Sequence, residues 1–115
     1  MSVFHIDDIK AVLFEGKGAT KVSKKSVLGP HNGWDDYVMR FFEIEPGGYT
    51  PKHKHDWPQY MFVVDGQGEL DLDGKIVDLK FGNAMLVPGN AEHQILNGGD
   101  QVLKFICVVP PEGDK

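Results

Sequence analysis

The chain has 115 residues, 41% of them hydrophobic and 25% charged, which suits one domain that can bury a core without disulfides. Its formal net charge of −5, from 12 basic and 17 acidic residues, argues against a nucleic-acid surface, which needs clustered positive charge. The single cysteine, Cys107, excludes an internal disulfide and agrees with a reducing compartment. The first residues lack the stages of a signal peptide, and no apolar run approaches the roughly 18 residues of a membrane helix. We therefore expect a cytoplasmic protein with no membrane or nucleic-acid partner.

The two ends of the chain are predicted to be simple. Residues 1–20 or so are expected to form a short strand or arm, and 8–15 could make one helical turn but lack an extended apolar stripe. The only basic cluster follows at Lys21, Lys24 and Lys25, and we interpret it as a solvated strand edge, where lysines discourage aberrant pairing. Residues 112–115 are expected to fray.

Between these ends, short runs rich in Val, Ile, Phe, Tyr and Leu are separated by turns of Gly, Pro, Asn and Asp. The predicted strands are 37–45, 59–64, 69–72, 75–79, 84–87, 93–96 and 102–109. Pro46-Gly47-Gly48 is expected to end the first strand, and Asp73-Gly74 joins two alternating runs in the strongest short hairpin signal. Short strands at regular spacing predict an all-β sandwich or barrel.

A set of histidines suggests a metal site. His53 and His55 are two residues apart, so in a strand both imidazoles project from one face, and Gln59 has the same parity. Because one strand cannot surround an ion, another ligand must come from elsewhere, and His93 is the best candidate. Imidazole suits Zn, Cu, Fe and Ni and tolerates Mn. Neutral ligands would leave the full charge of the ion to polarise a bound water or oxyanion.

Each of these residues also has a plainer interpretation. The two neighbouring histidines could form an exposed polar face, Gln59 could only hydrogen-bond a strand edge, and His93 could be a surface or core histidine. Together with turns that bring two strands side by side, they favour a metal site. His5 and His31 have no such setting and are predicted to lie at the surface.

Two spaced motifs are similar to those of the cupin family. The first consists of Gly47, His53, His55, Gln59 and Gly66; the second consists of Gly82, Pro88-Gly89-Asn90, His93 and Asn97. Fifteen residues separate the two motifs, a short gap that resembles small bacterial cupins. Gln59 stands where the family normally has Glu, and Asn90 stands where it usually has Gly.

The resemblance implies an all-β cupin barrel, also described as a jelly roll or double-stranded β-helix. It would form a single domain over residues 1–115, with the barrel itself at about 36–110. One divalent metal, among Mn, Fe, Ni, Cu and Zn, would bind His53, His55 and His93, with Gln59 in the fourth ligand position. The chain looks similar to small manganese-binding, dioxygenase-like cupins, which favours Mn or Fe. Cupins of this kind are often homodimers, and the apolar run 9–14 could pair across a two-fold axis.

Three further residues are candidates for the pocket walls. The family pattern favours Phe105 and Cys107 facing the metal, although both faces of their strand are apolar. Cys107 could equally be a small buried hydrophobe. Arg40 lies in an apolar strand, where it either faces solvent, pairs with an acidic residue, or clamps a carboxylate at the barrel mouth. Asp56 either orients an imidazole or is only a turn residue.

Two functions are compatible with this pattern, because the fold alone does not fix the reaction. The first is a metal-dependent enzyme, of dioxygenase or isomerase type, acting on a small oxygenated or carboxylate substrate. The sequence offers no obvious carboxylate as a general base for such an enzyme, and Glu92 and Asp56 are weak candidates. The alternative is a non-catalytic module that binds or senses a small ligand of the sugar-acid type and keeps its metal for structure.

Overall fold

The computed structural model describes residues 3–14 and 18–114. The described elements are η1 (Ile6–Asp8), β1 (Val12–Phe14), β2 (Thr20–Leu28), η2 (Pro30–Asn32), β3 (Val38–Tyr49), β4 (Gln59–Asp65), β5 (Gln67–Leu72), β6 (Lys75–Lys80), β7 (Ala84–Val87), β8 (His93–Leu96), β9 (Leu103–Val109) and η3 (Pro111–Gly113). Within 8–15, where one helical turn was considered, the chain forms the strand β1, and η1 precedes it; Glu15 lies outside the described residues. Within the described ranges, no helix is long and apolar enough to span a membrane.

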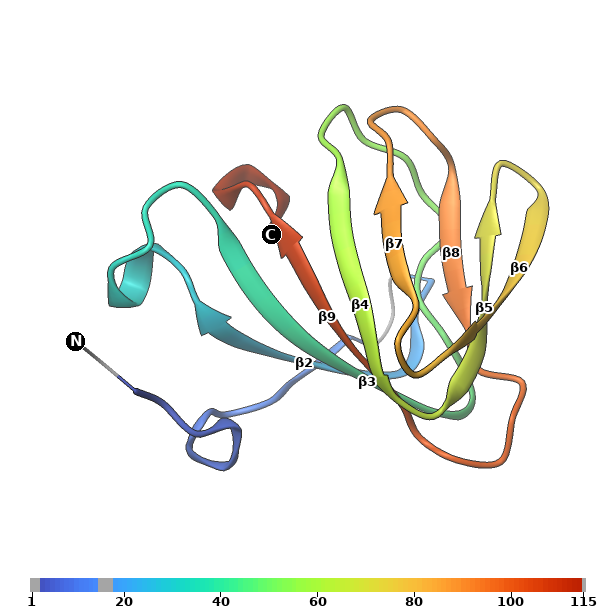
Figure 1. The fold of residues 1–115 in the computed structure, drawn as a ribbon, viewed down its shortest axis with the longest axis horizontal. Helices are drawn as coiled ribbons and strands as arrows, with labels where there is room; N and C mark the ends of the chain where they lie inside the picture. Colours follow the sequence, from blue (N-terminus) through green and yellow to red (C-terminus); the bar gives the residue numbers. More distant parts are fainter. Residues whose placement is uncertain (1–2, 15–17, 115) are drawn as a thin grey trace.

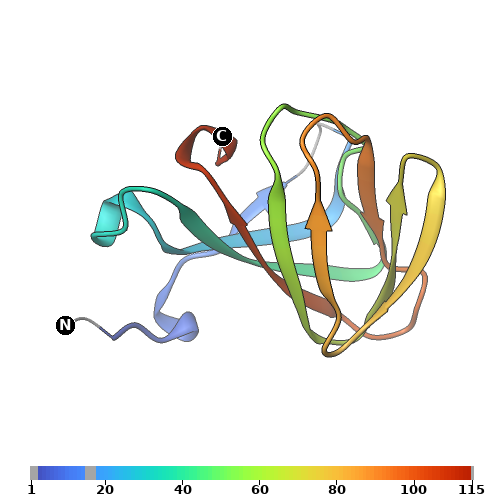
Figure 2. The ribbon, with the colours of Figure 1, turned by 45° about the horizontal axis from the view of Figure 1, so that its top comes forward.

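The strands form one antiparallel sheet that curls on itself. Its order is β6-β5-β8-β3-β9-β4-β7, with β2 added to β3 and β1 added to β2. Figures 1 and 2 show β4, β7, β8, β5 and β6 curling into a barrel, while β2 and β3 extend beyond it on the side of the two chain ends. The prediction of an all-β barrel is therefore confirmed. The hairpin predicted at Asp73-Gly74 joins β5 to β6.

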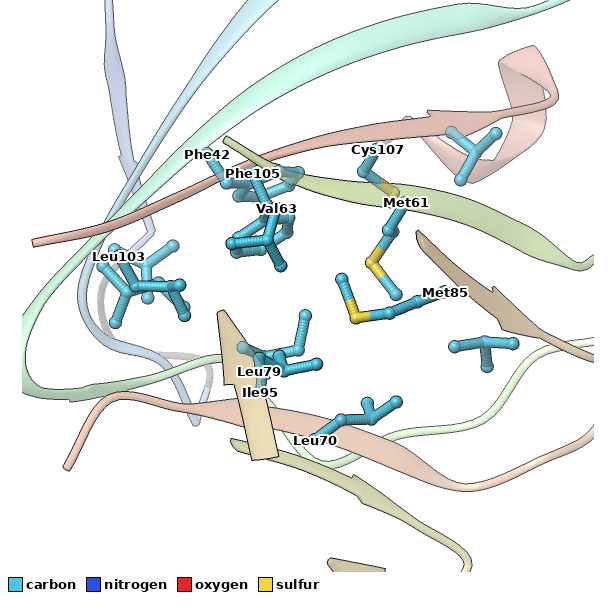
Figure 3. Close-up of a cluster of buried hydrophobic side chains, with 14 of the residues drawn as sticks. Phe42, Met61, Val63, Leu70, Leu79, Met85, Ile95, Leu103, Phe105 and Cys107 are labelled. Carbon is cyan, nitrogen blue, oxygen red and sulfur yellow. The ribbon is translucent and has the colours of Figure 1, made fainter. Parts of the chain in front are cut away.

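The core lies on the inner face of this curled sheet. Along β9, buried residues alternate with half-buried ones, as expected for a strand with one face inside. The register places Phe42 of β3 opposite Phe105 of β9, and Phe105 opposite Val63 of β4. Figure 3 shows these three side chains packed together beside Met61 and Cys107. Rows of inward side chains from neighbouring strands thus build the apolar interior that stabilises the barrel.

The first long strand does not end where the glycines suggested. β3 was expected to end at Glu45, but it continues to Tyr49. Gly47 has a φ of +83°, which L side chains rarely adopt, and a Cβ on Gly48 would lie 2.6 Å from the Thr20 carbonyl oxygen. The register with β2 shifts at this point. The predicted strand end is wrong because these glycines form an irregularity inside the strand rather than a turn.

Two expectations about the ends of the chain are also wrong, for one shared reason. Lys24, on β2, is only 9% exposed, so it does not belong to a solvated edge. Its Nζ lies 2.7 Å from Oδ1 of Asp114, which follows η3 near the end of the chain. A buried ammonium group requires a partner, and this ion pair ties down the described part of the segment expected to fray, residues 112–114; Lys115 lies outside the described residues.

Candidate metal centre

Three imidazoles meet where β8 begins. His53 and His93 form an isolated antiparallel bridge, in which each backbone N–H donates to the other residue's carbonyl at 3.1 and 2.9 Å. The backbone N–H of Asn90 donates to the carbonyl of His55 at 2.6 Å. As a result, the nitrogens that His53, His55 and His93 could offer to a metal all lie within 4.8 Å of one another. The structure thus brings the three predicted histidines together.

The path of the chain between these histidines and β4 differs from the prediction. His53 and His55 were expected on one extended strand that continues to Gln59. The chain instead bends at Asp56 and Trp57, and β4 begins only at Gln59. The shared direction of the imidazoles therefore comes from the bridge to β8 and the contact with Asn90, more than from strand parity.

Backbone carbonyls fix the orientation of two of the rings. Nδ1 of His55 lies 2.8 Å from the Trp57 carbonyl oxygen, and Nδ1 of His93 lies 3.0 Å from the Ala91 carbonyl oxygen. A carbonyl can only accept, so each Nδ1 carries the hydrogen and each Nε2 keeps its lone pair. The role considered for Asp56 is taken by these carbonyls, and Asp56 itself is exposed.

Gln59 belongs to the same cluster. Its side chain is 8% exposed, and its amide Nε2 lies 3.1 Å from Nε2 of His55. The amide group therefore reaches the imidazole nitrogen that would ligate an ion. An amide can turn its carbonyl oxygen to the place where the nitrogen now lies, because the two differ by a half-turn of the group.

The surroundings of His53 and His93 favour the neutral form of these two imidazoles. Burial is the main reason that the pKa of His53 falls from 6.5 to about 4, and the nearby His93, His55 and Arg40 lower it further. Burial also lowers the pKa of His93, against the opposing effect of its hydrogen bond to Ala91. Neutral imidazole is the form that binds metals, so these rings need no proton loss near neutral pH before they can act as ligands.

The donor set fits a divalent transition metal. His93 Nε2 is buried and has no hydrogen-bond partner among residues 3–14 and 18–114. A buried polar atom without a partner is unfavourable, and such atoms in folded proteins require an explanation. A metal ion on that nitrogen would supply one. Imidazole nitrogens with an amide oxygen make a site suited to first-row metals from Mn to Zn.

The three predicted pocket residues lie on the inner face of the sheet but differ in surroundings. Arg40 is 5% exposed, its Nη2 donates to Sγ of Cys107 at 3.1 Å, and its guanidinium lies 5.0 Å from the Phe42 ring centre. Burial raises the pKa of the Cys107 thiol, which supports the plainer interpretation of Cys107 as a small core residue. Phe105, two residues before Cys107 on β9, stacks on Phe42 with ring centres 5.1 Å apart.

A family model described as a cupin domain matches residues 40–109, which include all four predicted ligand positions and most of the sheet. This chain is a cupin. The resemblance predicted from the two motifs is therefore confirmed.

Several relatives of this cupin are named as enzymes. The chain is 27% identical over 108 residues to a 1-methylthio-D-xylulose 5-phosphate methylsulfurylase of Rhodospirillum rubrum, covering 94% of the chain and 69% of that protein. It is 30% identical to an L-ectoine synthase of Bordetella parapertussis, covering 96% of the chain and 84% of the relative. Among solved structures, the polyketide cyclase RemF of Streptomyces resistomycificus matches with a TM-score of 0.90 and 29% identity, over 96% of this chain and 79% of RemF.

Trp57 stacks on His55 with ring centres 4.5 Å apart and planes 7° from parallel. Sequence reasoning missed the ion pair that lies beside Arg40. Lys24 and Asp114 pair across the interior, although 90 positions separate them in the chain. One signal was available, because Val22, Lys24 and Ser26 alternate as a strand with a lysine on its inner side would.

Proposed function

We propose that this cupin binds one divalent transition metal through His53, His55 and His93, with Gln59 as the fourth ligand, and that it is a small metalloenzyme. The observation that supports this most directly is the buried, unpartnered Nε2 of His93, within 4.8 Å of the ligand nitrogens of the other two histidines. Mn or Fe is our first choice, because the amide oxygen is a harder donor than imidazole. The substrate would be a small oxygenated molecule or carboxylate, in a dioxygenase-like or isomerase-type reaction.

A bound divalent metal would act as a Lewis acid on a substrate oxygen. The protein's own residues would orient the substrate and exclude water. Arg40, held among Phe42 and Cys107, offers a guanidinium for a substrate carboxylate. The apolar residues Met61 and Met85 on β4 and β7 line the neighbouring interior and limit the access of water. Phe105 stacks on Phe42 and so helps to hold that ring in place.

Metal content tests the site directly. Protein purified without a metal-binding tag or chelator would be analysed for Mn, Fe, Ni, Cu and Zn, beside His53→Ala, His93→Ala and His31→Ala. We expect close to one metal per chain in the parent and in His31→Ala, whose histidine is exposed on η2, and a loss of most metal in the other two variants. A parent chain that takes up no metal when each ion is supplied would contradict the proposal.

A binding or sensing module is the second candidate. It is favoured by one observation: the two acidic residues closest to the histidines in sequence, Asp56 and Glu92, are both exposed. No buried carboxylate in the described part of the chain therefore stands ready as a general base. Turnover of small hydroxy- and keto-acids by the metal-loaded protein would favour the enzyme, whereas saturable binding without turnover would favour the module.

We also propose that this cupin is a homodimer. We propose the cytoplasm as its location, because a single free cysteine agrees with a reducing compartment. In the dimer, β1 and its neighbours would pair across a two-fold axis. Val12 is 55% exposed and Leu13 66% exposed on this short edge strand, which leaves apolar surface that a second copy could cover. Light scattering should give about twice the chain mass of 12.8 kDa, and Leu13→Lys should shift the protein toward the monomer.

A further inference from the structure

The last residue that the structure describes, Asp114, lies against the inner face of the sheet and is half-buried. After β9 the chain turns through η3 (Figure 1), and the carboxylate of Asp114 contacts side chains of β2 and β3. Its Oδ1 lies 2.7 Å from Lys24 Nζ and 3.8 Å from Arg40 Nη1, and its Oδ2 accepts a hydrogen bond from Ser26 Oγ at 3.4 Å. One carboxylate of the protein's own chain thus serves two cations.

This cluster carries more positive than negative charge. The side chains of Lys24 and Arg40 are only 11% and 6% exposed, and Asp114 is the one acid that pairs with either of them among the described residues. Buried charges are unfavourable unless they are matched, so the surplus cation needs a further anion or a compensating contact.

The guanidinium is the less satisfied of the two cations. Asp114 approaches it only at 3.8 Å, and the one hydrogen bond that it donates to a described residue goes to the thiol of Cys107, a weak acceptor. Its Nε is buried and has no acceptor within residues 3–14 and 18–114. A planar carboxylate can accept two parallel hydrogen bonds from a guanidinium, which is the contact that Asp114 does not make here.

The same C-terminal turn also touches the histidine cluster, through Trp57. A Cβ built on Gly113 would lie 2.6 Å from Trp57 Nε1, so the turn packs closely on the indole. That indole stacks on His55, and its buried Nε1 has no acceptor in the described part of the chain. The turn therefore spans the distance from the two cations to the edge of the candidate metal centre.

We propose that Lys24 and Arg40 form the carboxylate subsite for this cupin's ligand, and that Asp114 occupies this subsite until the ligand's carboxylate replaces it. The turn Pro111–Gly113 then acts as a strap, which moves off Trp57 when an acidic ligand enters. This deepens the proposed function: it rests on the same site and names the ligand as a small carboxylic acid. Ligand exchange here forms and breaks only ion pairs and hydrogen bonds.

Malonate, a small dicarboxylate, is a suitable probe. Its affinity would be measured by isothermal titration calorimetry for the parent, Asp114→Asn and Glu112→Gln, each with and without Mn²⁺. Glu112→Gln is the matched control, because it removes the same charge from the same turn at an exposed position. If the strap is closed nine-tenths of the time, removing the competing carboxylate should raise the affinity about tenfold in Asp114→Asn. Glu112→Gln should bind like the parent.

A folded Asp114→Asn protein that binds malonate no more tightly than the parent would overturn the subsite. The metal-free series keeps this result separate from the proposed metalloenzyme, since loss of metal binding in every variant leaves the anion measurement intact. Should Asp114→Asn fail to fold, Gly113→Ala gives the same test without any change of charge. Its Cβ forces the turn away from Trp57 and should also tighten malonate binding, and unchanged affinity in a folded Gly113→Ala protein would overturn the proposal.

Discussion

Two rows of inward side chains on the same three strands bury very different chemistry. The apolar row consists of Val22, Ile44 and Leu103; the polar row consists of Ser26, Arg40 and Cys107. The rows are four residues apart on each of β2, β3 and β9, and all three members of the apolar row are 0% exposed. Strand alternation thus decides which side chains face inward, but it does not decide whether a row stabilises the barrel or binds a ligand.

The largest expected effect comes from the apolar row. Leu103→Ala removes a fully buried side chain and leaves a cavity between β3 and β9, so the free energy of unfolding should fall by about 3 kcal/mol. Urea denaturation would measure the loss. Metal content per folded chain should stay at the parent level. A loss of metal as large as that in His93→Ala would contradict the assignment of a purely stabilising role to the apolar row.

A substitution in the polar row should have the opposite effect, with little change in stability and a large change in ligand affinity. Arg40→Met removes the surplus cation and leaves Lys24 paired with Asp114 at 2.7 Å, so the free energy of unfolding should change by about 1 kcal/mol or less. Malonate affinity should nevertheless fall at least tenfold, because the guanidinium is the proposed carboxylate partner. Loss of several kcal/mol in the same urea experiment would show that Arg40 is a structural residue.

The stability of the metal-free protein should depend on pH because of the histidine cluster. The folded state holds His53 at a pKa of about 4, whereas in the unfolded chain its pKa is near 6.5. The unfolded state therefore takes up a proton first, and the stability present above pH 6.5 is lost as the pH falls toward 4. Because His53 is exposed, we expect solvent screening to reduce this loss to about 1 kcal/mol. Urea midpoints between pH 7.5 and 5 would measure the loss, and His53→Ala should flatten the curve.

The smallest effect is expected at Cys107. Cys107→Ala shortens one core side chain and removes one weak acceptor of Arg40, so stability should change by about 1 kcal/mol or less. Metal content should be unchanged, since Cys107 lies outside the histidine cluster and burial raises the pKa of its thiol. A large loss of metal in this variant would show that Cys107 contributes to metal binding.

The parts of the molecule that were predictable from sequence are those encoded by local pattern. The Asp73-Gly74 hairpin follows from a turn that only a few residue pairs favour, and the histidine set follows from spacing within two motifs. The bounds of β2 were not predicted, and Lys24 was interpreted as solvated, because Lys24 and Ser26 give the inner face of this strand a polar pattern. The ion pair that accounts for the burial of Lys24 joins residues 90 positions apart, and no local sequence pattern predicts such a contact.

The orientation of the imidazoles was unpredictable for another reason. Trp57 and Ala91 act through backbone carbonyls, which every residue possesses and which sequence therefore does not distinguish. The same holds for the strand that continues past Gly47, because glycine serves turns and bulges alike. Both features depend on the path of the chain, which only the assembled sheet determines.

The backbone bridge between His53 and His93 has a consequence for how quickly the site fills. Its two hydrogen bonds hold the imidazoles in place through the main chain, so the ligands are gathered before any ion arrives. Ordering of the ligands then need not accompany binding, in contrast to small zinc domains that fold only with metal. Metal uptake by the folded protein should be a single fast step whose rate is proportional to the ion concentration, and the emptied barrel should survive to be filled again.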